Sequence, residues 1–282
     1  MTAADIYTEP DGDPDTLANL GPLAAMAGIW VGAGEDQHPT DPVDQPTGID
    51  AYEERYELQP IDFQTNGPQL LYGLRYHTRL VKPGEVAMFH EQVGFWLWEP
   101  ATGTVMFTLA IPRGQVALAS GRCAPDAKAF EIRAERGSLQ YGICTAPFLD
   151  ANFTTLDFRM TVRINDDGTW SYDQNTRLQL PDRAEVFDHV DANTLRRVAA
   201  PTPNPLAVAA GLPDGEQEGI VRRSRARVRH RHVEPHDAGH HHHAARAGAG
   251  GSDDQGRQSR PAFGPLRRRG RQSDPRAVED RR

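Results

Sequence analysis

The sequence predicts an all-β protein, built as an antiparallel up-and-down β-barrel of about ten strands with a short N-terminal helix and a disordered C-terminal tail. Two observations favour this fold class. Between about residues 50 and 200, short segments alternate apolar and polar residues at a period of two and are separated by turn-forming residues. No helical periodicity falls between these segments, so no crossover helices are available to connect parallel strands. A barrel of this width tends to keep a ligand cavity, because its own side chains do not fill it.

An amphipathic helix is predicted over residues 16–27, with Asp15 as its N-cap. Its apolar face contains Leu17, Leu20, Leu23, Ala24 and Met26. The segment before it, residues 1–15, is rich in aspartate and contains two prolines, and we expect it to be a disordered, solvated arm.

A run of glycines around one tryptophan follows the helix. Gly28, Trp30, Gly32 and Gly34 form the pattern Gly-x-Trp-x-Gly-x-Gly, which places backbone without Cβ atoms at the start of a strand. The chain is expected to bend there or to let another segment approach, and Trp30 to fill the closed end of the barrel. By itself the pattern is more typical of a structural strand kink than of a binding motif.

The remaining strands are predicted from alternation and from turn residues such as Asn66-Gly67-Pro68. The clearest example is the segment in which Phe130, Ile132 and Ala134 alternate with charged residues. The predicted strands cover residues 52–58, 70–80, 86–98, 104–111, 115–119, 129–135, 153–164, 170–180 and 183–198.

The composition changes abruptly near residue 210. Residues 211–282 hold 16 arginines, no lysine and 10 acidic residues, so their net charge is +6 and the rest of the chain carries −14. Few large apolar residues are present there to offset an ordering entropy of about 1 to 2 kcal/mol per residue. We therefore expect one barrel domain over residues 16–200 and a disordered, dispensable basic tail over residues 201–282, whose composition is also that of a frameshift product.

The two cysteines, Cys123 and Cys144, are expected to be free thiols. The sequence contains neither a secretory leader nor an apolar segment long enough to span a bilayer. These features favour a cytoplasmic location.

Among the histidines of the predicted domain, His38, His77, His90 and His189, the last has the most informative setting. Alternation places Phe187 on the same strand face as His189, where an aromatic ring suits a flat cofactor. The paired spacings of zinc sites, the nucleophile motif Gly-x-Ser-x-Gly and the phosphate-binding loops are missing. A single neutral imidazole as protein ligand indicates haem, whose porphyrin supplies the other equatorial donors. The alternative is a hydrogen-bonded or surface histidine without a ligand.

Three stretches of the chain resemble the nitrobindin family of haem-binding β-barrels. They are Gly28 to Gly34 with His38-Pro39-Thr40, the block from Met88 to Phe95, and Asp188-His189-Val190-Asp191-Ala192 with Leu195-Arg196-Arg197. The resemblance implies a ten-stranded barrel that holds one haem b with ferric iron in a wide cleft. It implies His189 as the proximal iron ligand, Thr40 as a haem contact and His90 on the distal side.

The same resemblance implies an enzyme, a peroxynitrite isomerase that forms nitrate and also binds nitric oxide. Nucleic acid and membranes are not expected as partners, and the sequence leaves a homodimer open. A second hypothesis is a carrier of a fatty acid or another apolar ligand, in which His189 only binds the head group. A third is nucleic-acid binding through the basic tail, which predicts salt-sensitive association.

Overall fold

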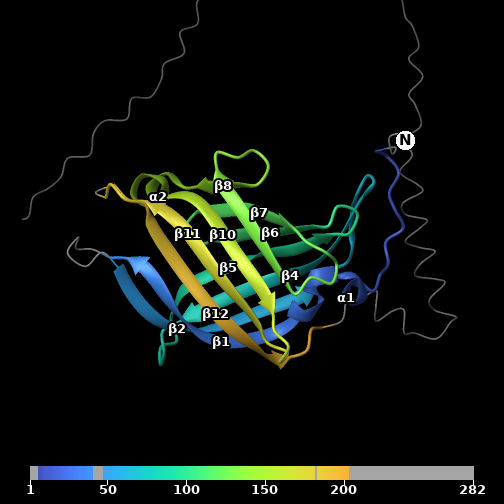
Figure 1. Ribbon diagram of the computed structural model, residues 1–282, viewed down its shortest axis with the longest axis horizontal. Helices are drawn as coiled ribbons and strands as arrows, with labels where there is room; N and C mark the ends of the chain where they lie inside the picture. The colour runs from blue at the N-terminus through green and yellow to red at the C-terminus, as the bar shows by residue number, and fades with distance from the viewer. Residues whose placement is uncertain (1–5, 41–46, 182, 203–282) are drawn as a thin grey trace, which may run out of the picture. The chain divides into compact units, whose positions relative to one another are not determined.

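The computed structural model describes residues 6–40, 47–181 and 183–202, and within them the chain forms a closed β-barrel (Figure 1). Helix α1 (Thr16–Asn19) and the 3-10 helix η1 (Gly21–Met26) precede the first strand, and helix α2 (Pro147–Asn152) lies at the other end of the barrel. The strands are β1 (Gly28–Pro39), β2 (Thr47–Pro60), β3 (Gln64–Asn66), β4 (Gln69–Val81), β5 (Met88–Glu99), β6 (Thr104–Ile111), β7 (Gln115–Arg122), β8 (Ala129–Arg136), β9 (Gly142–Thr145), β10 (Thr154–Ile164), β11 (Trp170–Gln179) and β12 (Phe187–Ala199).

The barrel closes because β2 pairs along both of its edges. The strand order is β2-β1-β12-β11-β10-β8-β9-β7-β6-β5-β4, and β2 also pairs with β4, which completes a ring of 11 strands in the described chain. All pairs in the ring are antiparallel except β8 with β9. The predicted barrel of about ten strands is confirmed. Because the first and last strands are neighbours, residues from the two ends of the domain lie side by side on β1 and β12.

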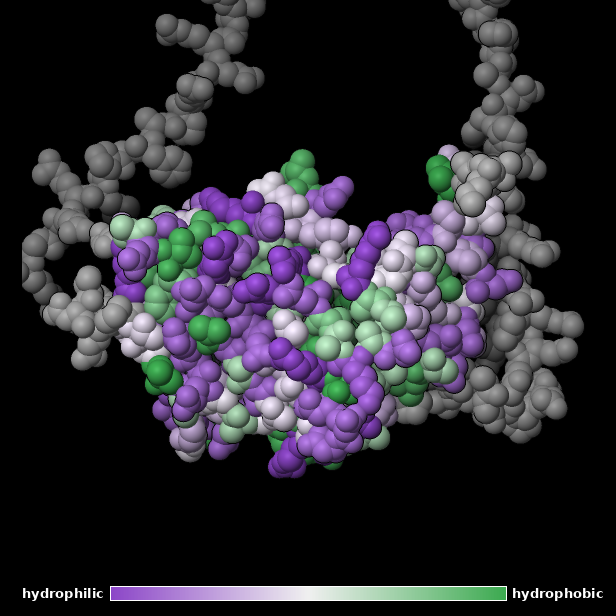
Figure 2. All heavy atoms as spheres, in the orientation of Figure 1, coloured by the Kyte–Doolittle hydropathy of each residue, from purple (hydrophilic) through white to green (hydrophobic). Residues whose placement is uncertain are grey.

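Alternate residues of each strand face the interior, as the sequence pattern predicted. Val105 and Phe107 of β6, and Phe130 and Ile132 of β8, are all buried. Together with aromatic side chains from the other strands they form one continuous core. On the outer surface, Figure 2 shows hydrophilic side chains over most of the visible face, with apolar ones scattered between them.

The N-terminal helical segment closes one end of the barrel, but it is not the single helix predicted over residues 16–27. It breaks at Gly21, whose φ of 55° lies in the left-handed region, and the 3-10 helix begins there with Pro22 in its first turn. Leu23 and Met26 are buried as expected, whereas Ala24 is exposed. The apolar spacing therefore predicted which residues are buried better than it predicted the helix itself.

Three short elements were missed, and several boundaries were wrong: β2 begins at Thr47 and not at residue 52, and β7 ends at Arg122 and not at residue 119. Strands β3 and β9 span three and four residues, too few to give a periodic pattern, and α2 spans six. The last strand was predicted from residue 183 but begins at Phe187.

The described part of the N-terminal segment contacts the barrel. The main-chain N–H of Asp13 donates to the hydroxyl of Tyr72 at 3.1 Å, and Thr65 on β3 donates to Glu9 at 3.0 Å. Residues 1–5 of the expected arm, and the expected tail from residue 203 onward, lie outside the described residues. Cys123 and Cys144 are free thiols, as predicted. The helices of the described chain are too short to cross a membrane.

Candidate functional site

His189 lies on the inner face of β12. The inward positions of this strand include Phe187, Asp191, Asn193 and Leu195, which are all buried, whereas the side chain of His189 is 35% exposed. A ligand can therefore reach the imidazole, although the histidine shares its face with core residues. The alternation predicted for Phe187 and His189 is confirmed.

The imidazole of His189 contacts a carboxylate on the neighbouring strand. Its Nε2 atom lies 2.7 Å from Oδ1 of Asp36 on β1, and the Asp36 side chain is 16% exposed. Asp36 is paired in register with Asp191, so two carboxylates meet beside the histidine. A short hydrogen bond to a charged group in a partly buried place is strong. This contact turns the tip of the ring toward β1.

A small apolar cluster, separate from the main core, lies beside His189 at the start of β12. Leu178 and Leu180 from the end of β11 pack against Phe187. The guanidinium of Arg183 lies 5.6 Å from the centre of the Phe187 ring, and it also donates a hydrogen bond of 3.0 Å to the carbonyl of Thr40. Thr40 follows β1 directly, so Arg183 ties the end of β1 to the segment that leads into the histidine strand.

His90 is a second histidine on the inner side of the barrel, on β5, where it is paired with the buried residue Leu80. Burial lowers its pKa, and the nearby cation of Arg113 lowers it further. The ring is therefore neutral at pH 7. The charges of Asp36 and His189 also act on the pKa of His90, which puts the two histidines in one electrostatic neighbourhood.

Between these histidines and the aromatic core lies a layer of buried polar side chains. The carboxylate of Glu54 on β2 accepts hydrogen bonds from the hydroxyl groups of Thr78 and Tyr172, at 2.7 and 2.9 Å. It also accepts one from the amide of Asn193 at 2.8 Å. Burial nevertheless raises the pKa of Glu54 to about 7.

A second carboxylate, Asp191, completes this layer. It accepts hydrogen bonds from the hydroxyl of Tyr52 and from the amide of Gln174, the latter at 3.0 Å. Tyr172 lies within 3.3 Å of Asp191 as well, so its hydroxyl connects the two acidic groups. Burial raises the pKa of Asp191 to about 6.

The glycines of the predicted motif make room for this polar layer and for the neighbouring strand. A Cβ atom on Gly32 would lie 2.5 Å from Oδ1 of Asn193, and one on Gly34 would lie 2.5 Å from the hydroxyl oxygen of Tyr52. Gly28 has a φ of 134°, and a Cβ there would lie 2.7 Å from a main-chain carbonyl of β12. All three glycines thus allow side chains or the main chain of neighbouring strands to approach the backbone of β1 closely.

Trp30 is fully buried at the closed end of the barrel, as expected. Its indole N–H donates to the carbonyl of Met26 at 2.7 Å, which links the wall of the barrel to η1. Its ring meets Trp170 edge to face, with 6.3 Å between the centroids.

Replacing Gly34 by alanine is expected to lower the free energy of unfolding by about 1 to 3 kcal/mol, because the new methyl group overlaps Tyr52 and forces it from its hydrogen bond with Asp191. Urea denaturation followed by intrinsic fluorescence measures this change. Ala33→Ser, on the exposed side of the same strand, is the control and is expected to change stability by less than about 0.5 kcal/mol. Equal stability of Gly34→Ala and the wild type would contradict this reading of the glycine.

The other two histidines have different surroundings. His38 is near the end of β1, and its Nε2 atom lies 3.2 Å from Asp50, which also binds Lys82. His77 lies on the outer face of β4, with its Nε2 atom 2.7 Å from Glu91.

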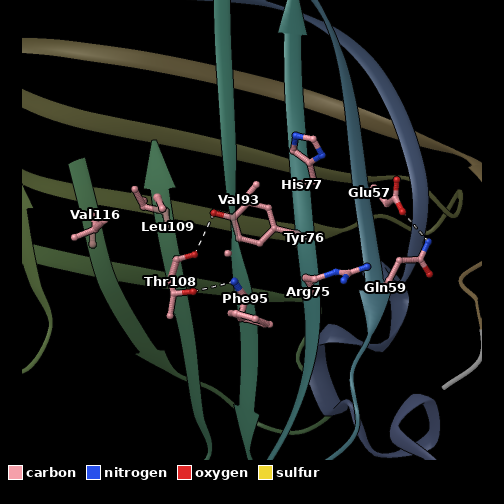
Figure 3. Close-up of a pocket in the computed structure, with 13 residues that line it drawn as sticks. Glu57, Gln59, Arg75, Tyr76, His77, Val93, Phe95, Thr108, Leu109 and Val116 are labelled. Carbon is pink, nitrogen blue, oxygen red and sulfur yellow. Dashed lines mark hydrogen bonds between the residues drawn. The ribbon is translucent and has the colours of Figure 1, made fainter. Parts of the chain in front are cut away.

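A groove with a volume of about 650 Å³ lies on the outer face of β2 and β4–β7. His77 is one of the residues that line it (Figure 3). The groove has an apolar part formed by Val93, Phe95 and Val116, which are exposed. His77 and Arg75 point from β4 at its polar side. This groove is separate from the inward position of His189.

Several polar residues of the interior were not predicted from the sequence. Asp36, Glu54 and Asp191 are charged residues at inward positions of barrel strands. Asp36 lies six residues from Trp30 and Asp191 lies two residues from His189, and Glu54 alternates with the aromatic residues Tyr52 and Tyr56. This even spacing along the strand was enough to indicate, from the sequence, that these side chains point inward. Among the described residues, no three side chains of histidine, cysteine, aspartate or glutamate converge as ligands for a bare metal ion.

Comparison with known proteins identifies the domain. A family model described as the THAP4-like, heme-binding beta-barrel domain matches residues 19–197. Among solved structures, the chain is similar to Rv2717c from M. tuberculosis, with 22% identity, a TM-score of 0.44, and coverage of 66% of this chain and 99% of that one. No match was found among curated proteins. The family match covers nearly the whole barrel, and the chain therefore belongs to the family of THAP4-like haem-binding β-barrels, the nitrobindin family.

Proposed function

We propose that the barrel binds one haem b through His189 and that the ferric haem protein isomerises peroxynitrite to nitrate and binds nitric oxide. The observation that carries this proposal is the position of His189, an accessible imidazole on the inner face of a barrel strand. Membership of a haem-binding family supports the cofactor. The reaction itself and the role of each residue go beyond the family match.

The residues around His189 fit a porphyrin. Leu178, Leu180 and Phe187 offer an apolar wall on the same part of the barrel. One accessible imidazole is a sufficient protein ligand, because the macrocycle supplies four nitrogen donors of its own. Arg183 holds a positive charge beside Phe187 that suits a propionate group. In this proposal Thr40, whose carbonyl binds Arg183, borders the haem.

Isomerisation of peroxynitrite breaks its O–O bond and forms a new N–O bond, with no net gain or loss of electrons or protons. A bound ferric haem would supply a Lewis-acid iron for a small anion. The neutral ring of His90 can donate a hydrogen bond to that anion. Arg113, whose cation acts on His90, provides local positive potential in a domain of net negative charge.

The proposal also includes a structural role for the glycine motif, a location and a set of partners. Gly28, Trp30, Gly32 and Gly34 shape the barrel around the site and do not themselves touch the haem. We propose that the protein acts in the cytoplasm on small ligands, without a membrane or nucleic-acid partner, and that a homodimer is compatible with this activity.

The experiment is a hemin titration of the purified full-length protein, followed by the Soret band. The wild type is expected to give a saturable band, and His189→Ala is expected to weaken hemin binding by at least about tenfold because the iron loses its protein ligand. His77→Ala is the matched control: it removes an imidazole from the outer face and is expected to leave the titration unchanged. Stopped-flow decay of peroxynitrite and the ratio of nitrate to nitrite then test the reaction.

The carrier hypothesis predicts a different result. A fatty-acid carrier would keep most of its affinity for a fluorescent fatty acid without His189, because the apolar chain supplies most of the binding, and it would show no Soret band that depends on this residue. Buried Glu54 and Asp191 disfavour that hypothesis, because an apolar chain reaching the aromatic core would have to pass both acidic groups.

A further inference from the structure

We infer that Asp36 controls haem uptake by holding the Nε2 atom of His189, so that the carboxylate and the iron compete for the same nitrogen. The inference rests on the proposed role of His189 as the iron ligand. It adds an inhibitory role for a residue that neither the sequence motifs nor the family match assigns.

The competition follows from the chemistry of imidazole. Each ring nitrogen offers one direction for either a proton or a metal, so a nitrogen that is hydrogen-bonded to a carboxylate cannot bind iron at the same time. In the structure it is Nε2, the nitrogen farther from the main chain, that lies 2.7 Å from Asp36. The Nδ1 atom is bonded to Cγ, the ring carbon that carries Cβ, so a porphyrin approaching Nδ1 would meet the backbone of β12.

The position of Asp36 makes the contact hard to break. Its side chain is 16% exposed, so water replaces only part of the lost hydrogen bond. Asp36 is also paired in register with Asp191, so the two carboxylates lie on neighbouring positions of adjacent strands. When His189 turns away, Asp36 loses its hydrogen-bond partner while the carboxylate of Asp191 still lies beside it. Haem uptake must overcome both effects.

The test compares hemin dissociation constants of full-length variants by Soret titration. Asp36→Asn keeps the shape of the side chain but removes its charge, and it is expected to bind hemin about tenfold more tightly than the wild type. The matched control is Glu35→Gln, which removes the same charge from the exposed side of the same strand and is expected to leave the affinity unchanged. Circular dichroism of the haem-free variants checks that each is folded.

A third comparison distinguishes the contact between Asp36 and His189 from a general effect of removing a negative charge. In the His189→Ala background, Asp36→Asn is expected to give no gain, because the competition requires the imidazole. Unchanged or weaker binding by Asp36→Asn, or an equal gain in both backgrounds, would overturn the inference while leaving the proposed function standing. Absence of a His189-dependent Soret band in both the wild type and Asp36→Asn would overturn the proposed function, and the inference with it.

Discussion

Trp30→Ala is expected to lower the free energy of unfolding by about 3 to 5 kcal/mol, a large share of the stability of a domain of this size. Trp30 is fully buried and packs edge to face against Trp170, so alanine leaves a cavity at the closed end of the barrel. The substitution also leaves the carbonyl of Met26 without its indole donor, which loosens η1 from the barrel wall.

Urea denaturation of Trp30→Ala and Trp30→Phe measures this loss. Phenylalanine keeps most of the apolar contact but cannot donate to Met26, so its cost is expected to fall between those of the wild type and alanine. Trp30→Phe also keeps the prediction testable if the alanine variant does not fold. A cost below about 1 kcal/mol for Trp30→Ala would show that the closed end of the barrel does not depend on this ring.

The strands could be predicted because one face of each is buried. Buried apolar residues alternate along β6, at Val105, Phe107 and Leu109, and along β8, at Phe130, Ile132 and Ala134, and both strands were placed to within one residue. The N-terminal helix was predicted less well because its apolar spacing fits one helix, while the backbone at Gly21 and Pro22 favours a break. Backbone preference at two residues outweighed a pattern spread over twelve.

The candidate site was predictable only strand by strand. The inward position of His189 follows from alternation within β12, and so does the shared face with Phe187. Its contact with Asp36 does not, because that contact depends on which strand lies beside β12 in the closed barrel, and the two residues are separated by 153 positions. The same holds for Tyr52 and Asp191, which Gly34 allows to meet. Alternation in the sequence predicts which side chains of a strand point inward. Which of these side chains meet depends on the order of the strands in the closed barrel.

Glu54 makes the stability of the barrel depend on pH. Burial raises its pKa from 4.5 to about 7, so the folded state favours the protonated acid more than the unfolded state does. The titratable groups that face it are Asp191, Tyr172, Tyr52 and Tyr56, and none of them supplies a positive charge. The stabilising contribution is therefore present below pH 4.5 and is lost as the pH rises through 7.

Glu54→Gln is expected to remove this dependence. A shift from 4.5 to about 7 corresponds to about 3 kcal/mol, so the variant should gain about that much stability relative to the wild type between pH 4 and pH 8. The amide of the new glutamine can also donate a hydrogen bond to Asn193. The Oδ1 atom of Asn193 is buried without a hydrogen-bond partner in the described chain, and the amide of the same residue contacts Glu54. Urea midpoints at several pH values measure the difference, with Glu53→Gln on the exposed side of β2 as the control. Parallel pH profiles for Glu54→Gln and the wild type would mean that the buried acid ionises without cost, which its surroundings do not permit.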